Sequence, residues 1–459
     1  MWGVQSFAAS SETVIISVAD FGLKPNSRIN AVPYVQHALR ACRAQPGATL
    51  FFPKGRYDFW ADHAVEREYF ETNTYDNNPK TLAILLDEMQ NLTIDGGGST
   101  FVMHGRMQPF TLDHCKNITL CNFTVDWDIP LTAQAVVTER NQDYMEVEID
   151  THQYPYVIEN NQLTFVGEGW KSVFWSIMQF EPETHFVRYN TGDNLGWTIF
   201  HAEEMRPGVV RLSDPKKKQN AWFPEAGTIL VLRHSDRDHA GIFLFHSEHT
   251  TLKHITLHHT CGLGILSQYS KDICFDDVHI VPNGAKGRVF SGHDDGFHFM
   301  GCSGLLKIEN CSWAGLMDDP INIHGTSSRV MEKLLPTTLK CRFMQDMSEG
   351  MEWGRPGEQV GFIENNTMRT VATGFIKSFT AIDKAEFILE FAEPLPDEVT
   401  AGYALENLTC TASAEIRRNH FGSCRARGLL VSTPGKVMIE ENIFESSGSA
   451  ILIAGDANA

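Results

Sequence analysis

Two short stretches of the chain carry paired carboxylates in matching positions. The first, His293 to Gly301, reads HDDGFHFMG, and the second, Met317 to Gly325, reads MDDPINIHG. An offset of 24 residues superposes four aspartates, Asp294 on Asp318 and Asp295 on Asp319. If 24 residues form one structural repeat, these carboxylates lie on adjacent strands, whose backbones are only about 4.8 Å apart. The sequence therefore predicts a crowded anionic cluster.

Such a cluster has three interpretations. Solenoid turns use Asn and Asp to accept hydrogen bonds from backbone amides, but stacked anions repel and raise one another's pKa, so such ladders favour neutral Asn. Calcium binds clustered carboxylates, although the sequence lacks the Asp/Asn/Gly loop spacing of a dedicated calcium site. The third interpretation is glycoside hydrolysis, in which one carboxylic acid protonates the leaving oxygen and another carboxylate acts at the anomeric carbon. The residues alone predict that two or three of the four carboxylates act, without saying which.

The residues around the aspartates are of types that bind sugars. Histidine and asparagine can hydrogen-bond hydroxyl groups, and the face of a tryptophan can stack on a pyranose ring. Arg237 and His239 precede a predicted coil at about the same position as the Asp pairs. The candidate substrate-binding residues are Asp294, His293, His324, Arg237, His239 and Trp127, with His298, Asn322 and Trp313 as weaker candidates.

Self-similarity at 22 to 24 residues extends beyond the Asp pairs. The apolar run Ile242 to Leu244 recurs at Gly264 to Leu266, and Asn419 to Phe421 recurs at Asn442 to Phe444. Short strands with inward apolar residues and Gly, Asn or Asp turns at this spacing are typical of a solenoid, the alternative being a β-sandwich with coincidental spacing. We therefore predict an all-β fold, a right-handed parallel β-helix of the pectate-lyase-like class.

The N-terminal segment predicts how the solenoid is closed. Residues 14–20 form an apolar run, residues 30–43 have apolar side chains at helical spacing with Asn30 as the cap, and Phe52 to Tyr57 reads FPKGRY. This order of strand, helix and strand resembles the entrance of pectate-lyase-like β-helices. The helix then covers the open end of the stack and removes an exposed sheet edge.

Two long segments interrupt the repeat. Residues 130–235 and 326–411 alternate apolar and polar residues between Pro- and Gly-rich turns, so each is predicted to be a small antiparallel β-barrel inserted between coils near the carboxylates. The predicted order is a cap with the first coils (1–129), a barrel (130–235), central coils with the active site (236–325), a second barrel (326–411) and C-terminal coils (412–459). The coil pattern continues to the last residues, so further coils are expected beyond them.

Composition argues against several classes of partner. The formal net charge of −19 at pH 7 argues against nucleic acid or an anionic membrane, and more weakly against a polyanionic substrate. The absence of a run of 18 apolar residues predicts no membrane span. The ten cysteines include no CxxC pair, which argues against zinc and thioredoxin chemistry and leaves disulfides open. No metal ion or other cofactor is predicted.

The first eleven residues lack the basic start and the long apolar core of a secretory signal. The chain is therefore either cytoplasmic or the mature form of an exported protein. We expect an extracellular or periplasmic location, with the cytoplasm as the alternative. The oligomeric state is left open, with a homodimer as one option.

Several motifs resemble the family 110 glycoside hydrolases. They are LTIDGGG from Leu92, HGRMQPF from His104, NFTVDWD from Asn122, DDG from Asp294 and LMDDPINIHG from Leu316. The resemblance covers nearly the whole chain and implies a bacterial exo-acting α-1,3-galactosidase, some members of the family removing the terminal galactose of the blood group B antigen. It also implies an inverting, metal-independent mechanism acting on an oligosaccharide or glycoconjugate.

A more distant likeness to the polygalacturonases suggests the roles. Carried over by position, Asp318 is the general acid, Asp295 and Asp319 hold and deprotonate the water, and Asp294 supports or binds. The chain lacks the Gly-His-Gly and Arg-Ile-Lys runs of the polygalacturonases, and the missing cationic clamp favours a neutral sugar. The alternatives are a polygalacturonase-like or polysaccharide-lyase-like enzyme acting on an acidic polysaccharide, and a noncatalytic glycan-binding β-helix.

Overall fold

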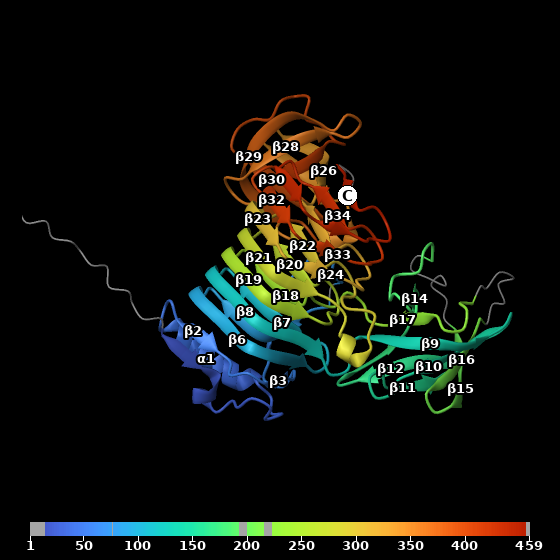
Figure 1. The fold of residues 1–459 in the computed structure, drawn as a ribbon. Coiled ribbons are helices and arrows are strands. Elements are labelled where there is room, and N and C mark those ends of the chain that lie inside the picture. The colour runs from blue at the N-terminus through green and yellow to red at the C-terminus, as the bar shows by residue number, and fades with distance from the viewer. Residues whose placement is uncertain (1–13, 76, 192–199, 215–222, 456–459) are drawn as a thin grey trace, which may run out of the picture.

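The protein folds as a stack of β-coils with two β-rich insertions (Figure 1). The computed structural model describes residues 14–75, 77–191, 200–214 and 223–455. Strands of successive coils pair in parallel over most of the stack, which confirms the predicted parallel β-helix. No helix within these ranges has the length and apolar character needed to cross a bilayer.

Two long sheets form the walls of the β-helix. The main path of the first comprises β1 (Ile15–Ser17), β2 (Thr49–Phe51), β6 (Gln90–Met103), β8 (Lys116–Trp127), β19 (Glu248–Leu257), β21 (Lys271–Ile280), β23 (Ser303–Glu309), β32 (Ala412–Arg417) and β35 (Val437–Glu440), in that order. Four shorter strands belong to the same sheet but lie beside this main path. They are β3 (Arg56–Phe59), β24 (Ser312–Trp313), β33 (His420–Phe421) and β36 (Ile443–Phe444).

The second sheet carries the strands that follow the Asp pairs. Its order is β4 (Val65–Arg67), β5 (Lys80–Asp87), β7 (Gln108–Asp113), β18 (Ile242–Phe245), β20 (Ile265–Gln268), β22 (Phe297–Met300), β25 (Ile321–His324), β34 (Leu429–Ser432) and β37 (Ile451–Ile453). β4 is the only strand in this order that pairs antiparallel, and it lies at the edge.

The interior of the stack is a ladder of inward apolar residues. Phe297 pairs with Ile321 and Phe299 with Ile323, so the 24-residue register predicted for the Asp pairs is confirmed. All four side chains are buried. Stacking such faces coil on coil buries the core that no single coil could bury alone.

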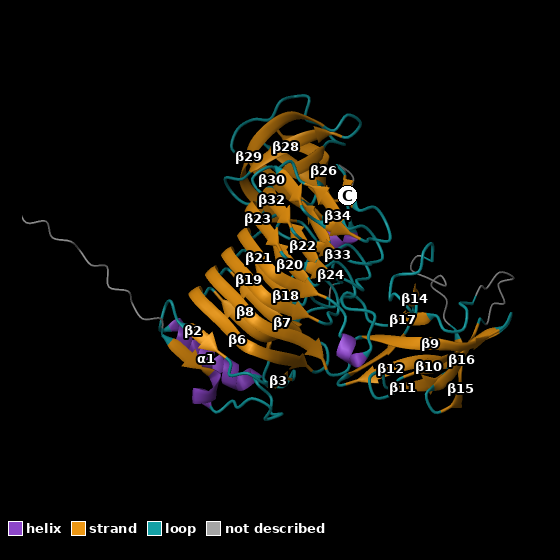
Figure 2. Ribbon diagram, viewed as in Figure 1, coloured by secondary structure: helices purple, strands orange, loops and turns teal. Residues whose placement is uncertain are grey.

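The helix α1 (Val32–Arg43) lies at the N-terminal end of the stack, where Figure 2 shows it against the first strands. It packs on β1, β2 and β5 through a buried face that includes Val32, Val35 and Leu39. The N-cap position is Ala31 rather than the predicted Asn30, but the Asn30 side-chain oxygen still accepts a hydrogen bond from the Val32 amide at 3.1 Å. Short 3-10 turns occur at Val18–Phe21, Gly284–Lys286 and Asp346–Ser348.

The first insertion consists of two antiparallel sheets. The larger has the order β14 (Ser176–Phe180), β17 (Ile229–Arg233), β9 (Thr132–Arg140), β10 (Tyr144–Ile149), β16 (Val209–Ser213) and β15 (His201–Arg206). The smaller has the order β11 (Tyr156–Glu159), β12 (Gln162–Gly167) and β13 (Trp170–Val173). Among the described residues the hydrogen-bonded order of the larger sheet is open at β14 and β15.

The second insertion is a closed barrel with its own apolar core, seen at one end of the stack in Figure 1. Its strands, in order around the barrel, are β26 (Ser328–Leu335), β27 (Thr338–Phe343), β30 (Glu386–Phe391), β29 (Arg369–Ala381), β28 (Gln359–Glu364) and β31 (Ala404–Asn407). The chain enters the barrel directly after β25 and leaves it directly before β32. It therefore interrupts the stack directly after the strand that follows the second Asp pair.

Candidate active site

The two Asp pairs lie in equivalent turns that lead into neighbouring strands. Asp294 and Asp295 precede β22, and Asp318 and Asp319 precede β25. Gly296 lies where the two turns come closest, because a Cβ atom there would be only 2.6 Å from the Pro320 carbonyl oxygen. The close stacking of these turns thus requires glycine at position 296.

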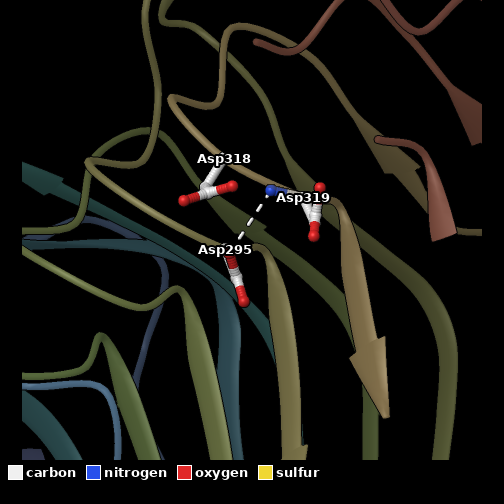
Figure 3. Close-up of side chains that lie close together, drawn as sticks. All are labelled: Asp295, Asp318 and Asp319. Carbon is white, nitrogen blue, oxygen red and sulfur yellow. Dashed lines mark hydrogen bonds between the residues drawn. The ribbon is translucent and has the colours of Figure 1, made fainter. Parts of the chain in front are cut away.

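Three of the four carboxylates converge. One oxygen from each of Asp295, Asp318 and Asp319 lies within 4.8 Å of the other two. Figure 3 shows the group, together with the hydrogen bond of 3.3 Å that the Asp319 amide donates to the Asp295 carboxyl. The predicted anionic cluster therefore exists, and like charges at such distances must be offset by cations or protons.

Three arginines supply much of the positive charge that offsets these carboxylates. Arg237 reaches Asp294 at 2.8 Å and Asp318 at 3.3 Å. Arg425 reaches Asp318 at 3.1 Å. Arg427 forms a forked pair with Asp319, its Nη2 donating to Oδ2 at 2.6 Å and its Nε to Oδ1 at 3.0 Å, and its backbone amide donates to Oδ1 at 2.7 Å. Forked guanidinium–carboxylate pairs fix orientation as well as charge.

Asp294 and Asp319 are the two aspartates held by close cationic partners. Both are completely buried. Burial alone would raise the pKa of Asp294, but Arg237 and the Nδ1 atom of His293, 2.9 Å away, outweigh it and hold that pKa well below its usual range. Asp319 has its forked partner Arg427. Breaking such a buried pair would leave an uncompensated charge, so both side chains are held firmly in place.

Asp295 and Asp318 have the opposite character. Burial, and then repulsion from Asp319, raises the pKa of Asp295 to about 7. Burial, and then repulsion from Asp295, raises the pKa of Asp318 to about 7. Two close carboxyls that both hold protons weakly near neutral pH titrate as a pair, so one proton is shared between them over a range of pH. Such a pair can supply an acid and a base at one pH.

Two histidines continue from Asp295 away from the carboxylate group. The Nδ1 atom of His298 lies 2.7 Å from the Asp295 carboxyl, and the Nε2 atoms of His298 and His324 are 2.7 Å apart. His298 is fully buried, whereas His324 is partly exposed at a cavity of about 560 Å³. The four aspartates are not among the residues that line this cavity. Asn322, His324 and Arg427 line it and lie between it and the aspartates.

Most of the predicted site residues meet at this place. The catalytic candidates Asp295, Asp318 and Asp319 lie together, with Asp294, His293 and Arg237 in contact around them. His324 reaches the cluster through His298 rather than directly. His293 is buried against Asp294, so its ring holds a carboxylate and not a sugar hydroxyl.

Two predicted binding residues, Trp127 and His239, are corrected by the structure. Trp127 is fully buried, and its ring nitrogen donates to the Gly105 carbonyl at 3.0 Å, so it presents no face to a sugar. His239 is also buried, lies stacked against Trp127 and bonds the Ala240 carbonyl. The weaker candidate Trp313 is core too, packed between Phe297 and Phe421.

The sequence reasoning missed Arg425, Arg427 and Asn73. β25 pairs with β34 at an offset of 108 residues, and the same offset places Arg427 on Asp319, but the second barrel separates the two coils in sequence. Extending the repeat across the barrel would have found this pair. Asn73 lies 3.5 Å from His298 on a loop with no repeat pattern, so no sequence signal marked it.

The three converging carboxylates are also a group that could hold a metal ion. Against this, Asp318 and Asp319 form ion pairs with arginines that already balance part of their charge, and the Asp295 carboxyl is engaged by the Nδ1 atom of His298. A divalent cation prefers carboxylates without such competitors. The arrangement therefore favours acid/base chemistry over metal binding.

Known proteins resemble this chain in sequence. Two family descriptions match its insertions, "GLAA-B beta-barrel domain I" over residues 133–230 and "GLAA-B beta-barrel domain II" over residues 338–405. An α-1,3-galactosidase B of Bacteroides thetaiotaomicron is 72% identical over 99% of this chain and 74% of its own length. An α-1,3-galactosidase A of Bacteroides fragilis is 35% identical over 96% of this chain and 73% of its own length.

Among solved structures, a family 28 exopolygalacturonase of Yersinia enterocolitica aligns at 10% identity with a TM-score of 0.33, covering 96% of this chain and 58% of that one. This likeness is too weak to add to the fold described above. The sequence relatives, in contrast, span the stack and both insertions. On their identity and coverage, the chain belongs to the α-1,3-galactosidases of glycoside hydrolase family 110.

Proposed function

We propose that the protein is an exo-acting galactosidase that hydrolyses terminal α-1,3-linked galactose with inversion. Its substrates are glycans such as the blood group B antigen or linear α-1,3-galactosyl structures. The names of the relatives support the substrate class. The observation that carries the chemistry is the pair Asp295 and Asp318, two adjacent carboxyls with raised pKa values between two aspartates that are paired with arginines.

Each carboxyl has a role that follows from its surroundings. Asp318 is the general acid, because its pKa is raised and its side chain, 14% exposed, meets solvent more than those of the other three aspartates. Asp295 is the base that takes a proton from water. Asp319, fixed by Arg427, orients that water and stabilises positive charge at the anomeric carbon. Asp294 holds Arg237 in place.

The distances between the carboxyl groups bear on the stereochemistry of the reaction. Inverting enzymes usually separate the carboxyls by roughly 6.5 to 9.5 Å and retaining enzymes by roughly 5 Å. Here the nearest oxygens are within 4.8 Å. Asp295 and Asp319 can hold one water between them, since hydrogen bonds of about 2.7 Å on each side allow oxygens about 5.4 Å apart. The short distance between Asp318 and Asp295 fits retention as well.

Incubation with three substrates tests the proposal. Galactose-α-1,3-galactose, blood group B trisaccharide and polygalacturonate are supplied separately, and released sugar is followed by proton NMR. We expect galactose from one or both galactosyl substrates, with the β-anomer appearing first. α-Galactose as the first product would reject inversion and leave the galactosidase activity standing.

The same panel separates the alternatives. An unsaturated product from polygalacturonate would indicate a lyase, and binding without release of sugar would indicate a noncatalytic glycan-binding protein. The arginines do not favour a uronate substrate, because Arg237, Arg425 and Arg427 are each paired with an aspartate. Their charge offsets that of the site itself.

We also propose that the protein works outside the cytoplasm. All ten cysteines are free, and most are buried, where a thiol behaves as a small apolar side chain. Cell fractionation followed by immunodetection tests the location. Light scattering of the purified protein tests whether a homodimer forms.

A further inference from the structure

A chain of three short polar contacts runs from Asp295 to the cavity. The Asp295 carboxyl contacts Nδ1 of His298 at 2.7 Å, and Nε2 of His298 contacts Nε2 of His324 at 2.7 Å. Nδ1 of His324 then contacts the carbonyl oxygen of Gly325 at 2.9 Å. All three distances are hydrogen-bond distances, and each hydrogen bond requires one hydrogen between its two heavy atoms.

Counting hydrogens shows that this chain holds one extra proton. A carbonyl oxygen has no hydrogen to give, so the His324–Gly325 contact needs a hydrogen on Nδ1 of His324. If His324 is neutral, its Nε2 is then an acceptor, and the hydrogen between the rings belongs to Nε2 of His298. If His298 is also neutral, its Nδ1 is an acceptor too. The hydrogen facing Asp295 must then belong to the carboxyl.

The surroundings decide which group carries that proton. Burial, followed by the charge of Arg237, lowers the pKa of His298 to about 3, and burial, followed by His298, lowers that of His324 to about 3. The charged groups that face Asp295 are Asp319, Arg237 and Asp294, with Asp318 beside them. Two polar side chains also contact the chain: the Asn322 amide donates to the Asp295 carboxyl, and the Asn73 amide lies next to Nε2 of His298. Two neutral imidazoles and a protonated carboxyl satisfy all three contacts.

We propose that His298 and His324 form a proton relay that carries the proton of Asp295 to the cavity. This proposal rests on the proposed function, in which Asp295 takes a proton from the attacking water. After each turnover the carboxyl O–H gives its proton to Nδ1 of His298. The Nε2 hydrogen of His298 passes to Nε2 of His324, and His324 releases its Nδ1 hydrogen to water in the cavity. Asp295 is then an anion again and both rings are neutral in their other tautomers, so the rings must reorient to restore the starting tautomers before the next transfer.

The relay explains why a fully buried histidine and a cavity histidine share a hydrogen bond. Asp295 is only 5% exposed, so its own route to bulk water is narrow. His324 is the member of the chain that lines the cavity. His298 and His324 are positioning residues for Asp295, because they act on the substrate only through that carboxyl.

Chemical rescue of His324→Ala tests the relay in turnover. The substrate is an aryl α-galactoside with an activated leaving group, so that departure of the leaving group does not limit the rate. We expect kcat to fall by up to about 10²-fold, the lower end of what one positioned proton-transfer group contributes, and to rise saturably with added imidazole. The matched control is His258→Ala, since His258 is also partly exposed and also bonds a backbone carbonyl, and it should show neither effect. Unchanged kcat in His324→Ala, or a loss that imidazole does not restore, would overturn the relay.

Neutron diffraction of the deuterium-exchanged wild-type protein tests the hydrogen positions without substrate. At pH 5 we expect deuterium on Nδ1 of His324, on Nε2 of His298 and on the Asp295 carboxyl. Deuterium on Nδ1 of His298 beside an ionised Asp295, with none on Nδ1 of His324, would overturn the assignment. If the wild-type protein releases no galactose, the proposed function fails while this measurement still decides the relay's hydrogens.

Discussion

The two Asp-Asp turns are equivalent by position and lead into paired strands, yet the two aspartates of each turn differ, and the order of the difference is reversed between the turns. In the first turn Asp294 is locked as an anion and Asp295 holds a proton near neutral pH. In the second turn the order is reversed, since Asp318 holds the proton and Asp319 is locked by Arg427. The repeat places the groups, and the partners differentiate them.

These partners come from places that the repeat does not control. Arg237 lies just after the first insertion, and Arg427 lies on the coil that follows the second. The histidine partner of Asp295 occurs only in the first copy, because Asn322 occupies the position of His298 in the second. A repeat can thus duplicate a carboxylate pair, while single residues around it decide which carboxylates exchange protons.

Removing either exchangeable carboxyl should have the largest effect. We expect Asp318→Asn to lower kcat/KM for galactose-α-1,3-galactose by about 10² to 10⁴, and to lose little on an aryl galactoside whose leaving group needs no acid. Asp295→Asn should be slow on both substrates, because the base is needed in either case. Asp277→Asn, a partly exposed aspartate on β21, serves as the control. If the activated substrate rescues Asp295→Asn instead of Asp318→Asn, the two roles are exchanged.

Unpairing a locked anion should act on stability. Arg237→Gln leaves the completely buried Asp294 without its closest cation, and breaking a buried ion pair costs about 3–5 kcal/mol in the free energy of unfolding. Lys377→Gln, which breaks an exposed pair with Glu390, should cost less than about 1 kcal/mol. Urea denaturation monitored by tryptophan fluorescence measures both. Equal losses of unfolding free energy in the two variants would mean that burial does not strengthen the dependence of Asp294 on Arg237.

The pH dependence of stability should separate the two kinds of carboxylate. The folded protein keeps the Asp318 proton up to a pKa of about 7, whereas the unfolded chain loses it near 3.8. Its contribution to stability is therefore full below pH 3.8 and is lost as the pH rises through 7, with a slope of up to about 1.4 kcal/mol per pH unit. Relative to wild type, Asp318→Asn should gain stability between pH 4 and 7.

Asp294→Asn gives the opposite case. The pKa of Asp294 is depressed in the folded protein, so its contribution is present above pH 3.8 and is lost only as the pH falls below it. Its difference from wild type should therefore be constant between pH 5 and 8. A pH-dependent difference in the free energy of unfolding for Asp294→Asn in that window, or a pH-independent one for Asp318→Asn, would contradict the assignment of these two carboxyls. Urea titrations at each pH supply the values.

Chelation should have the smallest effect. Because arginines already pair with two of the three converging carboxylates, Asp318 and Asp319, we expect EDTA to change kcat/KM by less than about twofold. Activity is compared before and after dialysis against EDTA, and again after calcium is added. A loss that calcium restores would show that a metal ion, and not the arginines, balances these carboxylates.

The periodic part of the molecule could be predicted from sequence. The alternation that buries Phe297 over Ile321 fixes both the coil and the stacking of the Asp pairs. The same alternation places Trp127 on the inward face with Phe123 and Val125, so its burial could have been predicted from the pattern. It was predicted to stack on a sugar instead, because tryptophan is a residue type that often does so. Residue type was the weaker guide there.

The rest depended on long-range contacts. Arg427 meets Asp319 across 108 residues that include a whole barrel, and Asn73 reaches His298 from a loop 225 residues away. The first contact follows the repeat only once the inserted barrel is recognised and bridged, and the second leaves no periodic trace because it is made once from a loop. Likewise, the hydrogen count that singles out His298 and His324 depends on distances between specific ring atoms, which no spacing encodes.

The second barrel has a consequence for biosynthesis. On a ribosome the chain is made from its N-terminus, so Asp318 and Asp319 are complete while the barrel is still being synthesised and Arg425 and Arg427 do not yet exist. During that interval the second Asp pair cannot be buried as anions without a large cost in free energy. The coil that carries it should therefore stay loosely docked until the barrel has closed and the next coil has arrived. The position of the barrel in the sequence thus delays the assembly of the active site until the chain beyond the barrel has been synthesised.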